Sequence, residues 1–294
     1  MARLAWVVVA GVVLALAMGV LLLDRRQAAR GAPSLFGIPW SREAVRGVPP
    51  GPPGSPRGAA GRGGRPGGAP PAGAAGRIAV IVDELGSRAD VFEQVLAFGR
   101  PVTIAVLPEL PLSRRIIRDA SRAGLEVLLQ LPLEPYRFPE QDPGPGALLV
   151  WMPPAEVARR ARQLLAGAPG VTGVTTHMGS RFMEDTERMQ ALLEAVRSQN
   201  LLFVDGLTTH RSAGYDLARA MGVRAARRQV LLDPDESEAT GRARLLEAER
   251  WAGRRGSVVA VARGRLLTLR LIEEALHRWE ALGLRLVPIS ELAS

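Results

Sequence analysis

The sequence predicts an α/β fold in which a parallel sheet curls into a (β/α) barrel. From residue 77 to residue 294, short apolar runs alternate with longer amphipathic segments, which is typical of a parallel sheet covered by helices. Eight such runs fall within 218 residues, close to the lower end of the size range of these barrels, about 200 residues. An open doubly wound sheet is the alternative, but no G-x-G-x-x-G turn follows the first run.

The elements follow one another in a regular order along this segment, which we define as a barrel domain over 77–294. Strands are expected at 78–83, 102–108, 126–132, 171–176, 201–205, 229–233, 257–263 and 284–290. Helices are expected in the gaps, at 87–99, 112–123, 154–167, 184–199, 212–221, 237–254 and 266–282.

Two segments of different character precede the barrel domain. Residues 5–23 contain nineteen residues without a charge, which is close to the roughly 20 that a membrane-spanning helix needs and longer than the roughly 7–15 of a signal peptide. We therefore predict a membrane anchor in residues 1–30, with a cleaved signal segment as the alternative. Residues 31–76 are rich in Gly, Pro, Ala and Arg and lack hydrophobic periodicity, so we predict a disordered linker there.

The net charge of +9 is concentrated outside the predicted barrel. Residues 1–76 carry nine arginines against Asp24 and Glu43, a net charge of +7, which leaves +2 for the remainder. The barrel has no basic stripe interleaved with aromatic residues, so we expect no nucleic-acid partner. The chain has no cysteine, which excludes a thiolate metal site and a cysteine nucleophile.

Titratable residues stand at or just beyond the carboxyl ends of most predicted strands. In a barrel these ends meet at one mouth, where the active site lies. Single aspartates after a strand also cap helices or form Asx turns, and this alternative stays open for Asp205 and Asp233. For the adjacent acids Asp83 and Glu84 a functional role is favoured over a structural one, because two neighbouring carboxylates repel each other unless a cation or a proton lies between them. The residues are Asp83, Glu84, Glu134, His177, Asp205, Asp233 and Arg263.

The three histidines differ in their surroundings. His177 lies in the loop motif TTHMGSRF and is a candidate functional residue. His210 follows two threonines in a polar loop, and His277 falls on the polar face of a predicted helix, where we expect it to be exposed. A Ser–His–Asp hydrolase built on Ser180 is disfavoured, because the chain has no G-x-S-x-G elbow.

Several segments resemble the motifs of the divergent polysaccharide deacetylases. IAVIVDELG (78–86) resembles the family's IDDLG-type opening, and TTHMGSRF (175–182) is similar to its NHMGSRF motif. LPLEP (131–135), FVDGLTT (203–209) and LLDPD (231–235) resemble further motifs, in the same order. The resemblance covers the whole of 77–294. It implies the distorted barrel of seven or eight strands found in the glycoside hydrolase/deacetylase superfamily.

The resemblance also implies a chemistry, the removal of N- or O-acetyl groups from a polysaccharide by water bound to a divalent metal, usually zinc. Carried over residue by residue, it makes Asp83 the catalytic base and Glu84 and His177 metal ligands, with Asp205 and Asp233 as further candidate ligands. The predicted substrate-binding residues are Glu134, Ser180, Arg181, Thr208 and Arg263.

Three residues depart from the family's pattern. Glu84 replaces an Asp, and its extra methylene moves the carboxylate by more than the roughly 0.2 Å that a metal site tolerates. Gln130 and Arg263 stand where the family has His, and a guanidinium cannot ligate a metal. Two hypotheses therefore remain: a zinc-dependent deacetylase with an altered site, or a glycan-binding or scaffold module without metal, in which Arg263 pairs with Asp83 or Glu84.

The resemblance implies a location as well. The substrates that it implies, acetylated envelope polysaccharide or peptidoglycan-type glycan, lie outside the inner membrane. We therefore expect a single-pass protein of the inner (cytoplasmic) membrane, with the barrel domain on the outer, periplasmic side. Arg25, Arg26 and Arg30 follow the apolar segment, and the positive-inside rule taken alone would favour the opposite orientation.

Overall fold

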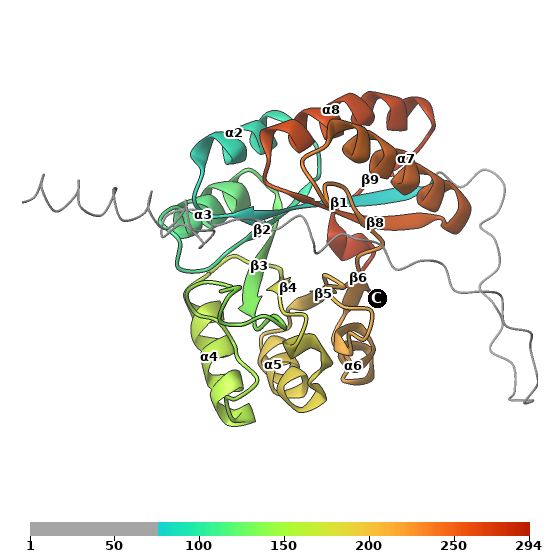
Figure 1. The fold of residues 1–294 in the computed structure, drawn as a ribbon. Coiled ribbons are helices and arrows are strands. Elements are labelled where there is room, and N and C mark those ends of the chain that lie inside the picture. Colours follow the sequence, from blue (N-terminus) through green and yellow to red (C-terminus); the bar gives the residue numbers. More distant parts are fainter. Residues whose placement is uncertain (1–75) are drawn as a thin grey trace, which may run out of the picture. The chain divides into compact units, whose positions relative to one another are not determined.

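The computed structural model describes residues 76–294 as an α/β domain built around a curled parallel sheet (Figure 1). The predicted anchor, and the predicted linker except for Gly76, lie outside the described residues. Within 76–294, no helix is long and apolar enough to cross a membrane.

The sheet contains nine strands, and every pairing between them is parallel. Eight of them pair in the order β6-β5-β4-β3-β2-β1-β8-β7, and β9 pairs separately with the start of β1. The strands are β1 (Arg77–Leu85), β2 (Thr103–Val106), β3 (Glu126–Leu133), β4 (Gly173–Met178), β5 (Leu202–Asp205), β6 (Ala225–Arg227), β7 (Val230–Leu231), β8 (Ser257–Arg263) and β9 (Arg285–Leu286).

All seven predicted helices are present, and each begins and ends within two residues of its predicted bounds. In the view of Figure 1, the helices α2, α3, α7 and α8 lie in the upper part of the domain, and α4, α5 and α6 lie in the lower part. The helices are α2 (Ala89–Ala97), α3 (Ser113–Arg122), α4 (Pro154–Ala166), α5 (Thr186–Ser198), α6 (Gly214–Ala220), α7 (Glu238–Arg255) and α8 (Leu266–Ala281).

Alternation along the strands divides the core into two layers. In β1, Ile78, Val80 and Val82 pack against the helices, whereas Ala79 and Ile81 belong to a smaller cluster inside the curled sheet. This period of two is what a pleated strand imposes when both of its faces are buried. It explains why the strands read as nearly continuous apolar runs.

The predicted strand at 284–290 is largely wrong, because only β9 forms there. β9 pairs with the first residues of β1, at the end of the barrel opposite its carboxyl mouth. Beyond it, Val287 and Ile289 enter the inner cluster, and the backbone N–H of Ile289 donates to the hydroxyl of Thr103 at 3.1 Å. The segment therefore plugs the amino end of the barrel instead of adding a strand to its wall.

A strand that was not predicted, β6, takes the remaining place in the wall, and the predicted strand at 229–233 shortens to β7. The chain crosses from one edge of the sheet to the other through Arg228 and Gln229. The N–H of Arg228 donates to the carbonyl of Asp205 at 3.0 Å, and that of Gln229 donates to Val259 at 2.9 Å. Within the described domain no strand pairing joins β6 to β7, so the barrel is distorted, as expected.

Candidate functional site

The carboxyl ends of four strands bring the predicted site residues together. Asp83 at the end of β1 stands beside Arg263 at the end of β8. His177 near the end of β4 stands beside Pro132 near the end of β3. β2 lies between β1 and β3 in the sheet, so these ends form one continuous stretch of the mouth.

A buried glutamine joins the two adjacent acids. The side-chain amide of Gln130 donates to Oδ2 of Asp83 at 3.2 Å, and its Oε1 accepts the backbone N–H of Glu84 at 2.8 Å. Glu84 has φ +59°, a left-handed conformation that is uncommon for a residue other than glycine and costs of the order of 1–3 kcal/mol. Such strained residues are concentrated at functional sites. Here the hydrogen bond from the backbone N–H of Glu84 to Gln130 helps to stabilise the left-handed conformation.

The carboxylate of Glu84 lies between an imidazole and a guanidinium. Its Oε1 is 3.8 Å from Nδ1 of His177 and 3.5 Å from Nε of Arg263. Burial, and in smaller part repulsion from Arg263, lowers the pKa of His177 to about 4. The imidazole is therefore neutral at pH 7, so only the contact with Arg263 is an ion pair.

Asp83 is partly buried, and its Oδ1 is shielded from solvent without a hydrogen-bond partner. Burial of the carboxyl, followed by repulsion from Glu84 and Asp233, raises the pKa of Asp83 well above its usual range. Arg263 and Arg228 act in the opposite direction but do not cancel this effect. Asp83 therefore holds a proton more tightly than an ordinary aspartate, a property that suits acid–base chemistry.

The motif around His177 turns the chain sharply. Met178 and Gly179 follow the histidine with φ +53° and +84°, and a Cβ on Gly179 would lie 2.8 Å from Cβ of Leu133. Only glycine fits that position without a shift of its neighbour. The turn directs the next two residues of the motif toward the end of β3.

Asp205 is fully buried, and its carboxylate organises the loop after β5. It accepts the N–H of Leu207 at 2.8 Å, the hydroxyl of Ser212 at 2.8 Å and the N–H of Tyr215 at 3.1 Å. Asp205 therefore has the geometry of a turn-forming aspartate, the structural alternative for this residue.

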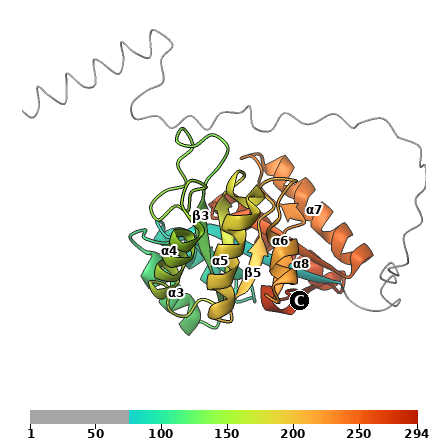
Figure 2. The ribbon, with the colours of Figure 1, turned by 90° about the horizontal axis from the view of Figure 1, so that it is seen from below.

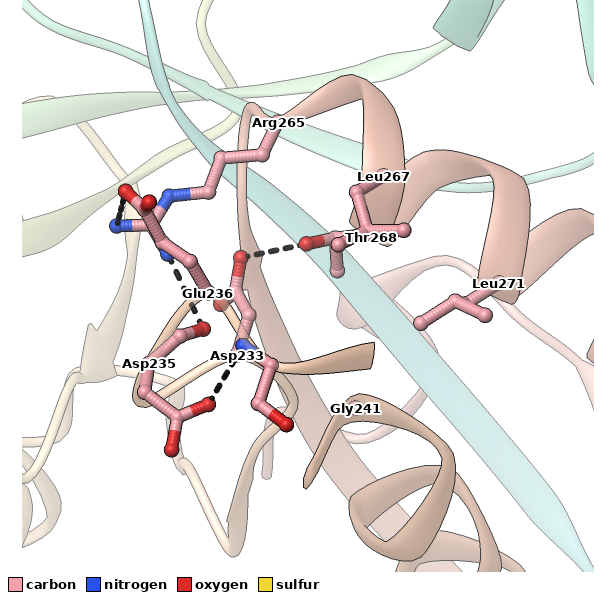
Figure 3. A pocket seen from close by; sticks show the side chains of 9 residues that line it. Asp233, Asp235, Glu236, Gly241, Arg265, Leu267, Thr268 and Leu271 are labelled. Carbon is pink, nitrogen blue, oxygen red and sulfur yellow. Dashed lines mark hydrogen bonds and ion pairs between the residues drawn. The ribbon is translucent and has the colours of Figure 1, made fainter. Parts of the chain in front are cut away.

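Asp233 is also buried, and its carboxylate is engaged by β8 and α8. It accepts the backbone N–H of Arg263 at 3.0 and 3.1 Å. It also accepts the hydroxyl of Thr268 at 2.9 Å (Figure 3). It also borders a cavity of about 260 Å³ between the β7–α7 and β8–α8 connections. The cavity is lined further by Asp235, Glu236, Ser237, Gly241, Arg265, Leu267, Thr268 and Leu271.

These donors do not fit the zinc centre that the resemblance implies. A catalytic zinc site uses three protein ligands, and no three His, Asp or Glu side chains of residues 76–294 are placed to hold one metal ion. Glu84 and His177 come near each other, but Arg263 contacts the same carboxylate oxygen. The roles of Glu84, His177, Asp205 and Asp233 as metal ligands stay predictions.

Three predicted substrate-binding residues meet at the connection between β3 and α4. Buried Glu134 forms an ion pair with Arg181 at 2.9 Å and accepts the N–H of Val150 at 2.7 Å. The hydroxyl of Ser180 accepts the N–H of Tyr136 at 3.0 Å.

Two exposed residues, Thr208 and His210, lie on the connection after β5. His277 is exposed on α8, as predicted.

Arg228 is a second cation near Asp83, and no motif of the sequence indicates it. Its guanidinium donates to the carbonyls of Gly206 at 2.6 Å and Leu207 at 2.9 Å, and burial lowers the pKa of Arg228. Arg228 belongs to the crossing from β6 to β7, whose path depends on how the sheet curls. Only the tertiary fold places it here.

Comparison with known proteins agrees with the fold and the motifs. The family model of the divergent polysaccharide deacetylases matches residues 80–293. The YibQ protein of Escherichia coli is 30% identical over 203 residues, which are 69% of this chain and 63% of that protein. A Haemophilus influenzae protein is 25% identical over 204 residues, 69% of this chain and 72% of that protein.

A crystal structure of an Agrobacterium tumefaciens protein superposes with a TM-score of 0.69 at 29% sequence identity, and the match covers 76% of this chain and 92% of that one. This structure supports the fold. The chain belongs to the divergent polysaccharide deacetylase family.

Proposed function

We propose that the barrel domain binds an acetylated polysaccharide of the cell envelope at its carboxyl mouth, and that it does so without a resident catalytic metal ion. The observation that carries this proposal is the ion pair between Arg263 and Glu84, with 3.5 Å between Nε and Oε1. It lies where the resemblance implies a metal ion, and membership of the family supports a glycan ligand.

The three departures from the family's pattern are connected through the acidic pair. Gln130 hydrogen-bonds Asp83 and the backbone of Glu84, and Arg263 pairs with the carboxylate of Glu84. A guanidinium carries a permanent positive charge and only donors. It therefore offsets the negative charge of the acids, a task that the metal would perform in an active deacetylase.

The chemistry of the mouth suits sugar hydroxyl and acetamido groups. The carboxylate of Glu84 supplies acceptors, Arg263 supplies donors, and neutral His177 supplies one donor and one acceptor. All three side chains are partly exposed. Few and fixed polar groups of this kind orient a ligand in a binding site.

Metal-dependent N- or O-deacetylation is the second candidate, and one observation favours it. Oδ1 of Asp83 lacks a partner although it is shielded from solvent, and the pKa of this carboxyl is raised. A strongly shifted carboxyl in a mouth is a common sign of a catalytic acid or base.

Binding and acetate release, measured together on the full-length chain, separate the two candidates. Calorimetry with N-acetylated chitooligosaccharides and peptidoglycan fragments should show binding, and acetate should stay at background with added zinc. Arg263→Ala should weaken binding, whereas Arg265→Ala, on the same β8–α8 connection, should not. Zinc-dependent acetate release that disappears in Asp83→Asn would overturn the proposal in favour of the deacetylase.

We further propose that residues 5–23 anchor the chain in the inner membrane, with the barrel on the periplasmic side. The uncharged nineteen-residue segment supports the anchor, and the location of envelope glycans supports the orientation. Because the chain has no cysteine, Gln199→Cys on the exposed end of α5 would give a single labelling site. Reaction with an impermeant maleimide before lysis of the inner membrane is expected, and reaction only after lysis would contradict this placement.

A further inference from the structure

We propose that Tyr136 and Trp151 form a stacking platform beside the mouth, on which an acetylated glycan lies as it extends out of the site. This inference rests on the proposed function and adds to it the residues that bind the chain beyond the first sugar.

Both aromatic side chains are exposed in a protein that has few of them. Tyr136 is 50% and Trp151 is 66% exposed, although Phe, Trp and Tyr make up only 4% of the chain. Large aromatic side chains contribute most when they are buried. A tryptophan left two-thirds open is therefore poorly explained by core packing.

The backbone on either side of Trp151 is fixed. The N–H of Val150 donates to the buried carboxylate of Glu134 at 2.7 Å. On the other side, Met152 is buried, and its carbonyl accepts Nε of Arg188 at 3.2 Å. The side chain of Trp151 thus projects from an anchored segment.

Tyr136 is held even more firmly while half of its surface stays open. Its N–H donates to the hydroxyl of Ser180 at 3.0 Å. Its phenol oxygen contacts the carboxylate of Glu184, the hydroxyl of Thr209 at 3.2 Å and Nη2 of Arg211 at 3.2 Å. These contacts fix the ring before any ligand arrives, which lowers the entropy cost of binding.

The platform is close to the mouth. His177 pairs with Pro132 in the sheet. Tyr136 lies four residues beyond Pro132, so the Cα atoms of Pro132 and Tyr136 are at most about 14 Å apart. Ser180, which Tyr136 contacts, follows His177 by three residues. Figure 2 shows the green β3–α4 connection extending past β3 at one end of the domain. An oligosaccharide held at His177 would extend over it.

The surroundings of the rings match a sugar. A pyranose has apolar C–H faces and polar edges, so it pairs with an aromatic face that has hydrogen-bonding groups beside it. Glu184, Thr209 and Arg211 supply such groups around Tyr136. A protein partner would instead need a contiguous interface of about 1,000 Å² or more.

The test compares short and long probes on the full-length chain. The probes are N-acetylglucosamine and its acetylated β-1,4-linked tetramer, measured by calorimetry. Trp151→Ala and Tyr136→Ala should each weaken tetramer binding roughly tenfold, as expected for loss of an anchor worth somewhat over 1 kcal/mol. Monomer binding should not change, and Trp151→Phe should retain most of the tetramer affinity.

Trp251→Ala provides the matched control. Trp251 is 37% exposed and lies on α7, where it packs under the guanidinium of Arg255. Its removal should leave both affinities unchanged. Thermal melting of every variant checks that the domain is folded.

The possible failures differ. If the native chain binds the tetramer and the Ala variants bind it equally well, the platform is overturned while the proposed function stands. Equal losses for monomer and tetramer would also overturn the platform, because they indicate damage to the mouth. If the native chain binds neither probe, the proposed function fails and the platform fails with it.

Discussion

Nε of Arg263 lies 3.5 Å from Oε1 of Glu84, across the ends of the neighbouring strands β8 and β1. The same carboxylate oxygen lies 3.8 Å from Nδ1 of His177. One fixed cation therefore lies close to both residues that the family resemblance assigns to a metal. Several measurable properties of the site follow from this arrangement.

The titration of His177 should report directly on Arg263. Burial and the nearby guanidinium lower the pKa of His177 to about 4, so Arg263→Ala should raise it toward the ordinary value of about 6.5. NMR titration can resolve this shift, because the chain has only three histidines. Arg265→Ala should leave it unchanged. A native His177 that titrates near 6.5 would contradict the burial and charge described for the site.

The same lowered pKa predicts a loss of stability in mild acid. Between about pH 6.5 and pH 4 the unfolded chain takes up a proton on His177 that the folded chain does not, so the free energy of unfolding falls as pH falls. The full effect is about 3 kcal/mol. Urea denaturation at pH 7 and pH 4.5 should show that His177→Gln removes most of this dependence, whereas His277→Gln on exposed α8 keeps it.

Asp83 should have the opposite pH dependence. Its pKa is raised in the folded state, so stability is lost as pH rises above about 3.9, the unfolded value, through the folded one. Asp83→Asn should therefore be more stable than the native chain at pH 7, and the gain should shrink toward pH 4. Asp216→Asn, at an exposed position on α6, serves as the control. A melting temperature that falls in Asp83→Asn at pH 7 would contradict the raised pKa of Asp83.

Asp205 should contribute to the stability of the folded domain. Asp205→Ala removes the acceptor of Leu207, Ser212 and Tyr215 in a buried site, and each unsatisfied buried group costs roughly 1–3 kcal/mol. We expect a loss of at least about 2 kcal/mol in the free energy of unfolding. Asp216→Ala, at an exposed position on α6, should stay within about 0.5 kcal/mol of native. Equal stabilities would show that the loop finds other partners.

The sequence predicts the helices and the long strands well, because each has enough residues to show its period. It misses β6 and predicts β7 and β9 too long, and these three strands have only two or three residues each. Too few positions are then available for an alternation to appear. Whether Val287 and Ile289 fill the barrel or line its wall depends on the curl of the sheet, and no local pattern encodes that curl.

The site shows the same division. The predicted strands place Asp83, Glu84, His177 and Arg263 at or just beyond strand ends, and the parallel register brings them to one mouth. Two other features could not be foreseen. The hydrogen bonds of Gln130 to both acids, and the approach of Arg228 to Asp83, depend on side chains that meet across the fold and are separated along the chain.

Zinc stoichiometry tests the central claim most directly. The full-length chain would be loaded with zinc, desalted and analysed beside Arg263→His and the double variant Arg263→His/His177→Ala. We predict far less than one zinc per native chain, about one in Arg263→His, and loss of that zinc in the double variant. About one zinc per native chain, lost in His177→Ala alone, would contradict the account and identify the mouth as a metal-dependent deacetylase site.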